Sequence, residues 1–243
     1  MILYNNHQYW KKPILALADL CRVNDDLGRY RFQAAYLHRP MFGMHGSCFL
    51  TSGIVENTVT WDTDNLVEDW WFSLQVSSAI MGGQGNKLTS RLQAHQQGFK
   101  FGWIPCIARE QSPQTITDYI KQRRRWYKGI LTLGDPVGYL SIATWTWPLL
   151  VPSMTIFYLL ISGWPEAIAS WCYALLAFDE AVRICGLSLA LFIQDLDAMV
   201  GWEDMLWHQS LCLLLAPTLW ILDATAILSA WIDMPSGFEV ISK

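Results

Sequence analysis

The sequence predicts an α/β domain over residues 1–135, followed by α-helical transmembrane segments over residues 136–243. The first observation is composition: of 243 residues, 52% are hydrophobic and only 16% are charged, which is unusual for a soluble globular protein. The second is charge. The first part holds 15 Lys or Arg and 11 Asp or Glu, a net charge of +4, whereas the second holds 2 and 10, a net charge of −8. The third is that eight of the 14 tryptophans lie in the second part, as at membrane interfaces.

Three apolar runs in the second part predict two or three membrane crossings. The run at 142–163 has no charge over 22 positions, enough for one crossing. The run at 167–193 contains Asp179, Glu180 and Arg183, which indicate either a short polar bend, an internally paired cluster or a functional site within the membrane. The run at 205–232 carries only His208 and Asp223. A buried all-helical soluble domain is the alternative for the whole region.

A basic cluster precedes the first run. Because positive residues beside a crossing stay on the cytosolic side, the cluster predicts that the first part faces the cytosol. Its members are Lys121, Arg123, Arg124, Arg125 and Lys128.

The first part shows mixed patterns. Glycine turns and a short apolar strand are expected over 41–53, and alternating aromatic residues predict a half-buried strand over 98–108. The segment "LVEDWWFSLQ" predicts a helix with Glu68 and Asp69 in its first turn, where the helix dipole favours acids. Ser112-Pro113 is expected to open another helix.

This second helix contains "TITDYIKQRRRWYKGIL", residues 115–131. Gln122, Arg125 and Trp126 lie at positions i, i+3 and i+4 and therefore share one helix face. An amide, a planar guanidinium and an indole together suit a diphosphate and a ring. Taken alone, the segment is better explained as a cytosolic anchor before a membrane helix.

The order of the motifs decides between these alternatives. "HGSCF", "VEDWW", Q-x-x-R-W and apolar helices follow one another as in the second half of membrane-bound family 2 glycosyltransferases. "LADLCRVNDDLGRYRFQ", "FGMHGS", "GFKFGWI", "EQSPQTITDYIKQRRRWYKG" and "FEVISK" further resemble the egghead-type β-1,4-mannosyltransferases of glycolipid synthesis. The resemblance implies the C-terminal half of a GT-A-type domain over 1–135 and an integral membrane protein of the endoplasmic reticulum or Golgi.

The resemblance also implies a reaction, inverting mannosyl transfer from GDP-mannose to a lipid-linked sugar, with a divalent metal (Mn or Mg). Asp69 would be the catalytic base, and Glu68 would orient Asp69 or cap the helix. Gln122, Arg125 and Trp126 would contact the diphosphate and the acceptor. The bilayer, the nucleotide sugar and a glycolipid are the implied partners, and no nucleic acid is expected.

The loop before these motifs carries three weaker candidates. Gly46 and Ser47 would let the backbone approach a substrate closely, although an ordinary turn has the same letters. His45 is either a substrate contact or a packed loop histidine.

Two features depart from the family pattern. The D-x-D metal motif normally lies upstream of everything matched here, and "DTD" at Asp62–Asp64 is expected to be a polar turn. The chain is therefore expected to lack half of the donor site and the metal ligands, and not to turn over. Residues 76–93, "VSSAIMGGQGNKLTSRLQ", have no hydrophobic period and are either a surface loop or a translated intron.

Two other functions remain open at this level. One is a processive polysaccharide synthase, which product length would distinguish. The other is a non-catalytic membrane scaffold that binds a partner.

Overall fold

The computed structural model describes about three quarters of the chain. Most of the first apolar run lies outside the described residues, as do the Asp62–Asp64 triplet, His45, Ser47 and residues 82–93. The described residues are 2–4, 9–44, 46, 49–59, 61, 66–81, 100–136, 138–140, 142–143 and 166–232.

Two short parallel strands join the start of the chain to its middle. Strand β1 (Ile2–Tyr4) pairs with β2 (Ala108–Glu110), with Tyr4 opposite Glu110. A strand was predicted earlier, over 98–108, but the described residues 100–107 form no strand. The backbone N–H of Phe101 instead donates to the carbonyl of His38 at 2.8 Å, which ties this segment to a loop.

Short helical segments follow β1 and form one core with the C-terminal helices. Leu17, Leu20 and Val23 are fully buried there together with Leu191 of the C-terminal part. These segments are α1 (Pro13–Ala18), α2 (Leu20–Asp25) and the π-helical turns η1 (Asp26–Tyr30) and η2 (Gln33–Leu37).

The short strand predicted within 41–53, beside glycine turns, is absent from the described residues of this segment. The Gln33 side chain instead hydrogen-bonds to the backbone of the loop. Its amide donates to the carbonyl of Gly43 at 2.8 Å, and its oxygen accepts from the N–H of Phe42 at 2.9 Å. Gly43 also has φ +81°, outside the strand region. Helix α3 (Gly53–Val59) begins where the strand should end.

The two predicted helices are present with shifted ends. Helix α4 (Glu68–Met81) starts with the two acids and continues through the first residues of the 76–93 segment. Helix α6 (Ile116–Leu133) begins three residues after Pro113, because Thr115 is its N-cap and accepts from the Asp118 N–H at 3.1 Å. Gly134, with φ +67°, ends it.

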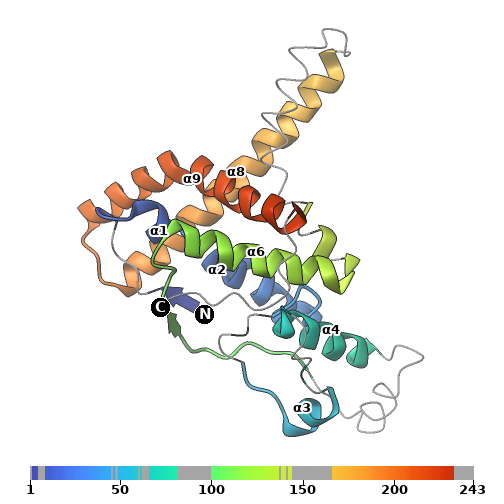
Figure 1. The fold of residues 1–243 in the computed structure, drawn as a ribbon. Coiled ribbons are helices and arrows are strands. Elements are labelled where there is room, and N and C mark those ends of the chain that lie inside the picture. The colour runs from blue at the N-terminus through green and yellow to red at the C-terminus, as the bar shows by residue number, and fades with distance from the viewer. Residues whose placement is uncertain are drawn as a thin grey trace.

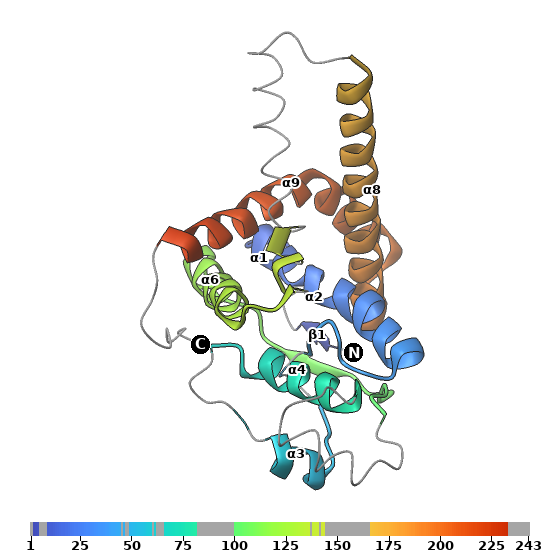
Figure 2. The same cartoon turned by 90° about the vertical axis from the view of Figure 1, so that its right-hand side faces the viewer.

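Two long helices complete the described chain, α8 (Glu166–Asp197) and α9 (Trp202–Ile232). The first half of α8 projects away from the other helices, whereas its second half lies against α2 and α9 (Figures 1 and 2). The predicted polar bend in α8 is wrong, since the helix is continuous. The paired cluster is confirmed: Arg183 Nε donates to Asp179 Oδ2 at 2.7 Å.

Among the described residues, α9 alone is long and apolar enough to cross a membrane. His208 and Asp223, which the sequence analysis singled out in this apolar run, both contact other parts of the protein. His208 Nδ1 lies 3.0 Å from Asp195 Oδ2, and its ring stacks on Tyr9 at 3.8 Å between centroids. Asp223 contacts α6. The two or three crossings expected from sequence stay a prediction.

Candidate functional site

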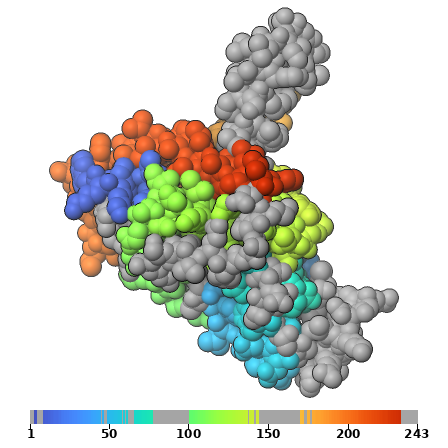
Figure 3. Space-filling model, in the orientation of Figure 1, coloured from blue at the N-terminus to red at the C-terminus, as the bar shows by residue number. Residues whose placement is uncertain are grey.

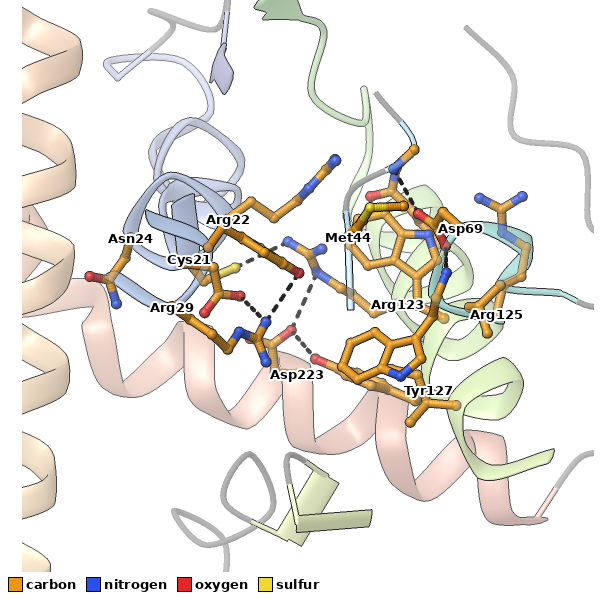
Figure 4. Close-up of a pocket in the computed structure, with 18 of the residues that line it drawn as sticks. Cys21, Arg22, Asn24, Arg29, Met44, Asp69, Arg123, Arg125, Tyr127 and Asp223 are labelled. Carbon is orange, nitrogen blue, oxygen red and sulfur yellow. Dashed lines mark hydrogen bonds and ion pairs between the residues drawn. The ribbon is translucent and has the colours of Figure 1, made fainter. Parts of the chain in front are cut away.

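A pocket of about 410 Å3 lies between α2, η1, α4 and α6, and α8 and α9 close its far side (Figure 4). It brings together residues from distant parts of the sequence. Six of the eight predicted site residues line it, and the other two, His45 and Ser47, lie outside the described residues. The six are Gly46, Glu68, Asp69, Gln122, Arg125 and Trp126.

A glycine contact explains why α4 and α6 meet at this point. A Cβ atom on Gly129 of α6 would lie 2.6 Å from Val67, the residue before α4, so only glycine permits this approach. Val67 and Trp70 are buried in one cluster with Tyr127 and Ile130. This packing places the acidic first turn of α4 beside the middle of α6.

Asp69 is held by backbone donors. Its Oδ2 accepts from the N–H of Gly46 at 2.8 Å, and its Oδ1 accepts from the N–H of Trp70 at 2.7 Å. A Cβ on Gly46 would lie 3.1 Å from Oδ2, so the backbone approaches Asp69 closely here, whereas the expected approach to a substrate stays a prediction.

The surroundings of Asp69 make it a better proton acceptor than an exposed aspartate. Burial raises its pKa, and the charge of Glu68 adds to this, while the two N–H donors and Arg22 act in the opposite direction. A carboxylate with a raised pKa is closer to the value that suits general base catalysis near neutral pH. Glu68 lies in the first turn of α4 and therefore acts on Asp69 through charge.

The three residues of α6 face this carboxylate. The buried Oε1 atom of Gln122 has no hydrogen-bond partner within the described part of the chain, which leaves an acceptor for a ligand hydroxyl or N–H. Burial lowers the pKa of Arg125, and the charges of Glu68 and Asp69 oppose this shift. Arg125 is therefore a partly desolvated cation next to two acids.

Trp126 is occupied by protein cations. The Cζ atoms of Arg22 and Arg123 lie 4.8 and 4.4 Å from its ring centroid, within range of cation–π attraction. Sequence patterns suggested an indole face open to a sugar or base, and did not indicate these two partners.

The basic cluster of α6 is not one surface. The Arg123 guanidinium is 3% exposed and donates to Asp19 Oδ1 at 2.9 Å, and Lys128 is also buried. Only part of the cluster is therefore placed to meet solvent or lipid headgroups, which weakens the simple topology signal expected from sequence.

Several pocket residues were not predicted individually. Arg22 pairs with Glu110 at 3.2 Å, and Arg29 pairs with Asp25 at 2.8 Å. Most of them belong to "CRVNDDLGRY", whose resemblance to a family segment was the one available signal. Sequence patterns did not indicate their roles, because an ion pair between α2 and β2, such as Arg22–Glu110, is visible only in the tertiary structure.

The described residues do not provide a metal site. No three His, Cys, Asp or Glu side chains come together among them in a way that could hold a metal ion.

Comparisons with known proteins identify the family of the chain. The model of "Glycosyl transferase family group 2" matches residues 2–231. "Beta-1,4-mannosyltransferase egh" of Drosophila melanogaster is 32% identical over 121 residues, 49% of this chain and 22% of the relative. "Beta-1,4-mannosyltransferase bre-3" of Caenorhabditis elegans is 33% identical over 121 residues, 49% of this chain and 23% of the relative.

The alignments therefore span less than a quarter of these relatives. No solved structure matches the chain. The two parallel strands and surrounding helices fit the GT-A type α/β fold that the family implies. Because the family model covers almost all of the sequence, the chain belongs to glycosyl transferase family group 2.

Proposed function

We propose that the chain carries the base and acceptor side of an inverting hexosyltransferase. Its reaction is the transfer of mannose from GDP-mannose to a sugar carried by a lipid. The observation that supports this most is that Asp69 and the Gln122, Arg125 and Trp126 trio surround one pocket despite their separation in sequence. The names of the relatives support mannose as the sugar.

In the proposed reaction, the Asp69 carboxylate accepts the proton of an acceptor hydroxyl. The oxygen of that hydroxyl forms a bond to the anomeric carbon of mannose. The bond from this carbon to the diphosphate breaks on the opposite face, which inverts the configuration and releases GDP. The raised pKa of Asp69 favours the first proton transfer.

In this proposal, residues of α6 bind the substrates, and Arg125 stabilises the diphosphate of the leaving GDP. Arg125 offers a planar set of donors to the diphosphate, and its partial desolvation strengthens that attraction. The unpartnered Oε1 of Gln122 accepts from a substrate hydroxyl. The family generally uses a divalent metal, but no step is assigned to one here, because the described residues offer no ligand set.

We further propose that the protein is an integral membrane protein of the endoplasmic reticulum or Golgi, with its pocket facing the cytosol. Apolar side chains of α9 such as Leu214 and Ile221 are exposed, and so is Trp171 on the projecting half of α8. In Figure 3, α9 (red and orange) lies along the upper edge of the molecule, directly above α6 (green). The exposed apolar side chains of α9 support contact with lipid on this side of the molecule.

A chimera tests the proposal without depending on how much of the enzyme this chain contains. The chain replaces its aligned segment in the Drosophila relative, and transfer from radiolabelled GDP-mannose to a glycolipid is measured in membranes. Asp69→Asn should lower kcat by roughly 10²- to 10⁴-fold, the usual loss for a general base. Asp204→Asn, an exposed acid in α9, is the matched control and should retain activity.

Equal activity of the Asp69→Asn and wild-type chimeras would remove the base from the proposal. Products with many added sugars would favour the processive synthase. The same assay on the chain alone tests the expectation that it does not turn over, and an inactive wild-type chimera would favour the scaffold.

A further inference from the structure

The apolar helix α9 contributes an acid to the pocket. Asp223 lines the cavity, as does Trp220 one turn earlier on the same helix face. The contact of α9 between His208 and Asp195 lies outside the pocket, as does the hydrogen bond from Gln209 to the Ser188 carbonyl at 3.0 Å. The two ends of α9 are therefore fastened in different ways, and only one of them contacts the proposed site.

One carboxylate oxygen of Asp223 collects three groups from α6. Its Oδ1 accepts from Tyr119 Oη at 2.7 Å and from Tyr127 Oη at 3.2 Å, and it lies 3.6 Å from Arg123 Nε. These α6 residues are spaced four apart and form one face. Figure 4 shows Asp223 on α9 beneath Arg123 and Tyr127.

The Arg123 guanidinium is fixed on two edges. Its Nη2 donates to Asp19 Oδ1 at 2.9 Å, and its Nε faces Asp223. A guanidinium is planar, so two carboxylates on different edges set its orientation and not only its position. Its Cζ then lies 4.4 Å from the ring centroid of Trp126, with the ring of Tyr119 4.8 Å away.

We propose that Asp223 is a positioning residue that holds the indole of Trp126 in its place in the pocket through Arg123. A carboxylate in the apolar part of a helix is costly unless hydrogen bonds and an opposite charge compensate it, and here the compensating charge is that of Arg123, which lies against Trp126. The assignment concerns geometry. Only its consequence for acceptor binding rests on the proposed function.

The consequence for transfer is a specific loss. Without the Asp223 charge, Arg123 keeps the Nη2 hydrogen bonds to Asp19 Oδ1, to the Ala18 carbonyl and to Cys21 Sγ, but its Nε loses its ion-pair partner, and the indole shifts. Because Trp126 belongs to the proposed acceptor contact, the KM for acceptor should rise, by roughly tenfold for a contact of this kind, with kcat changed much less.

Fluorine NMR of the chain labelled with 5-fluorotryptophan tests the assignment directly. The Trp126→Phe variant identifies the Trp126 resonance, and Trp207→Phe identifies a distant reference, an indole stacked on Trp10. Asp223→Asn, which keeps an acceptor for the tyrosines but loses the charge, should shift the Trp126 resonance and leave that of Trp207 unchanged. Arg123→Lys, which loses the guanidinium plane, should do the same.

Thr225→Val is the matched control, because Thr225 is exposed two residues further along α9 and bonds only to its own helix. It should move neither resonance. An unmoved Trp126 resonance in Asp223→Asn, or equal movement at Trp126 and Trp207, would overturn the proposal.

If Asp223→Asn does not fold, Tyr119→Phe provides the same test, since it removes the 2.7 Å bond and no charge. A shift at Trp126 alone supports the proposal, and an unmoved Trp126 resonance overturns it. The spectrum requires neither donor nor acceptor, so failure of sugar transfer in the chimera leaves this outcome unaffected.

Discussion

Two faces of α6 carry residues that are neighbours in sequence and differ in environment. The face toward α9 holds Arg123, which reaches the edge of the pocket but whose guanidinium is 3% exposed between Asp19 and Asp223. The face toward the pocket holds Arg125, a cation beside Glu68 and Asp69. The same residue type, arginine, thus stabilises the fold on one face and belongs to the proposed site on the other. The two arginines differ in burial and in their charged partners.

The largest expected effect comes from removing the arginine of the α9 face. Arg123→Met leaves the buried Asp19 carboxylate without its partner, which should lower the free energy of unfolding by about 3–5 kcal/mol. Arg125→Met is the comparison and should cost about 1 kcal/mol or less. Urea denaturation followed by circular dichroism measures both, and equal losses would contradict the division of α6 into two faces.

The contact that holds the pocket face against α4 should give the next effect. Gly129→Ala places a methyl group 2.6 Å from Val67, which should destabilise the fold by about 1–3 kcal/mol. Adding Val67→Ala makes room for this methyl group, so the double variant should be more stable than the sum of the two single changes predicts. Simple additivity in denaturation would show that the two residues do not set the spacing of the helices.

A smaller and local effect is expected from the cation of the pocket face. Arg125→Lys keeps the charge but loses the planar fork, so the affinity for GDP should fall by about tenfold while unfolding changes little. Isothermal titration calorimetry of the chimera with GDP measures this. Arg31→Lys is the matched control, because Arg31 is exposed near Trp103 and does not line the pocket. An equal fall in GDP affinity for Arg31→Lys would show that the effect does not depend on contact between Arg125 and the diphosphate.

The smallest effect concerns the protonation of Asp69. Carbon NMR of this carboxyl should give a titration midpoint above the ordinary value of 3.8, because burial raises the pKa. Glu68→Gln should lower the midpoint by removing a negative charge, and Arg22→Gln should raise it. A midpoint below 3.8 in the wild type would show that the two N–H donors outweigh burial.

The raised pKa of Asp69 also determines how its contribution to the free energy of unfolding depends on pH. A carboxyl with a raised folded pKa binds its proton more tightly in the folded state, so its contribution is present below the unfolded pKa and is lost as pH rises through the folded pKa. Asp69→Asn should remove this part of the pH dependence of unfolding.

Several features were predictable because they depend on local patterns. Paired acids and an aromatic-rich segment predicted α4, and residue spacing placed Gln122, Arg125 and Trp126 on one face of α6. A short strand within 41–53 and a strand over 98–108 were predicted, but the described residues of 41–53 and residues 100–107 form no strand. An alternating pattern of aromatic or apolar residues also occurs in loops, such as the one that the Gln33 side chain holds by hydrogen bonds.

Sequence by itself determined the family and the candidate residues for the proposed chemistry, since motif order is a property of the chain alone. Only the tertiary structure decided which arginine of three is buried, that protein cations occupy the indole of Trp126, and that Asp223 of the apolar helix lies at the pocket. The physical reason is that burial and charge pairing arise between segments distant along the chain, and no local pattern records which surfaces will meet.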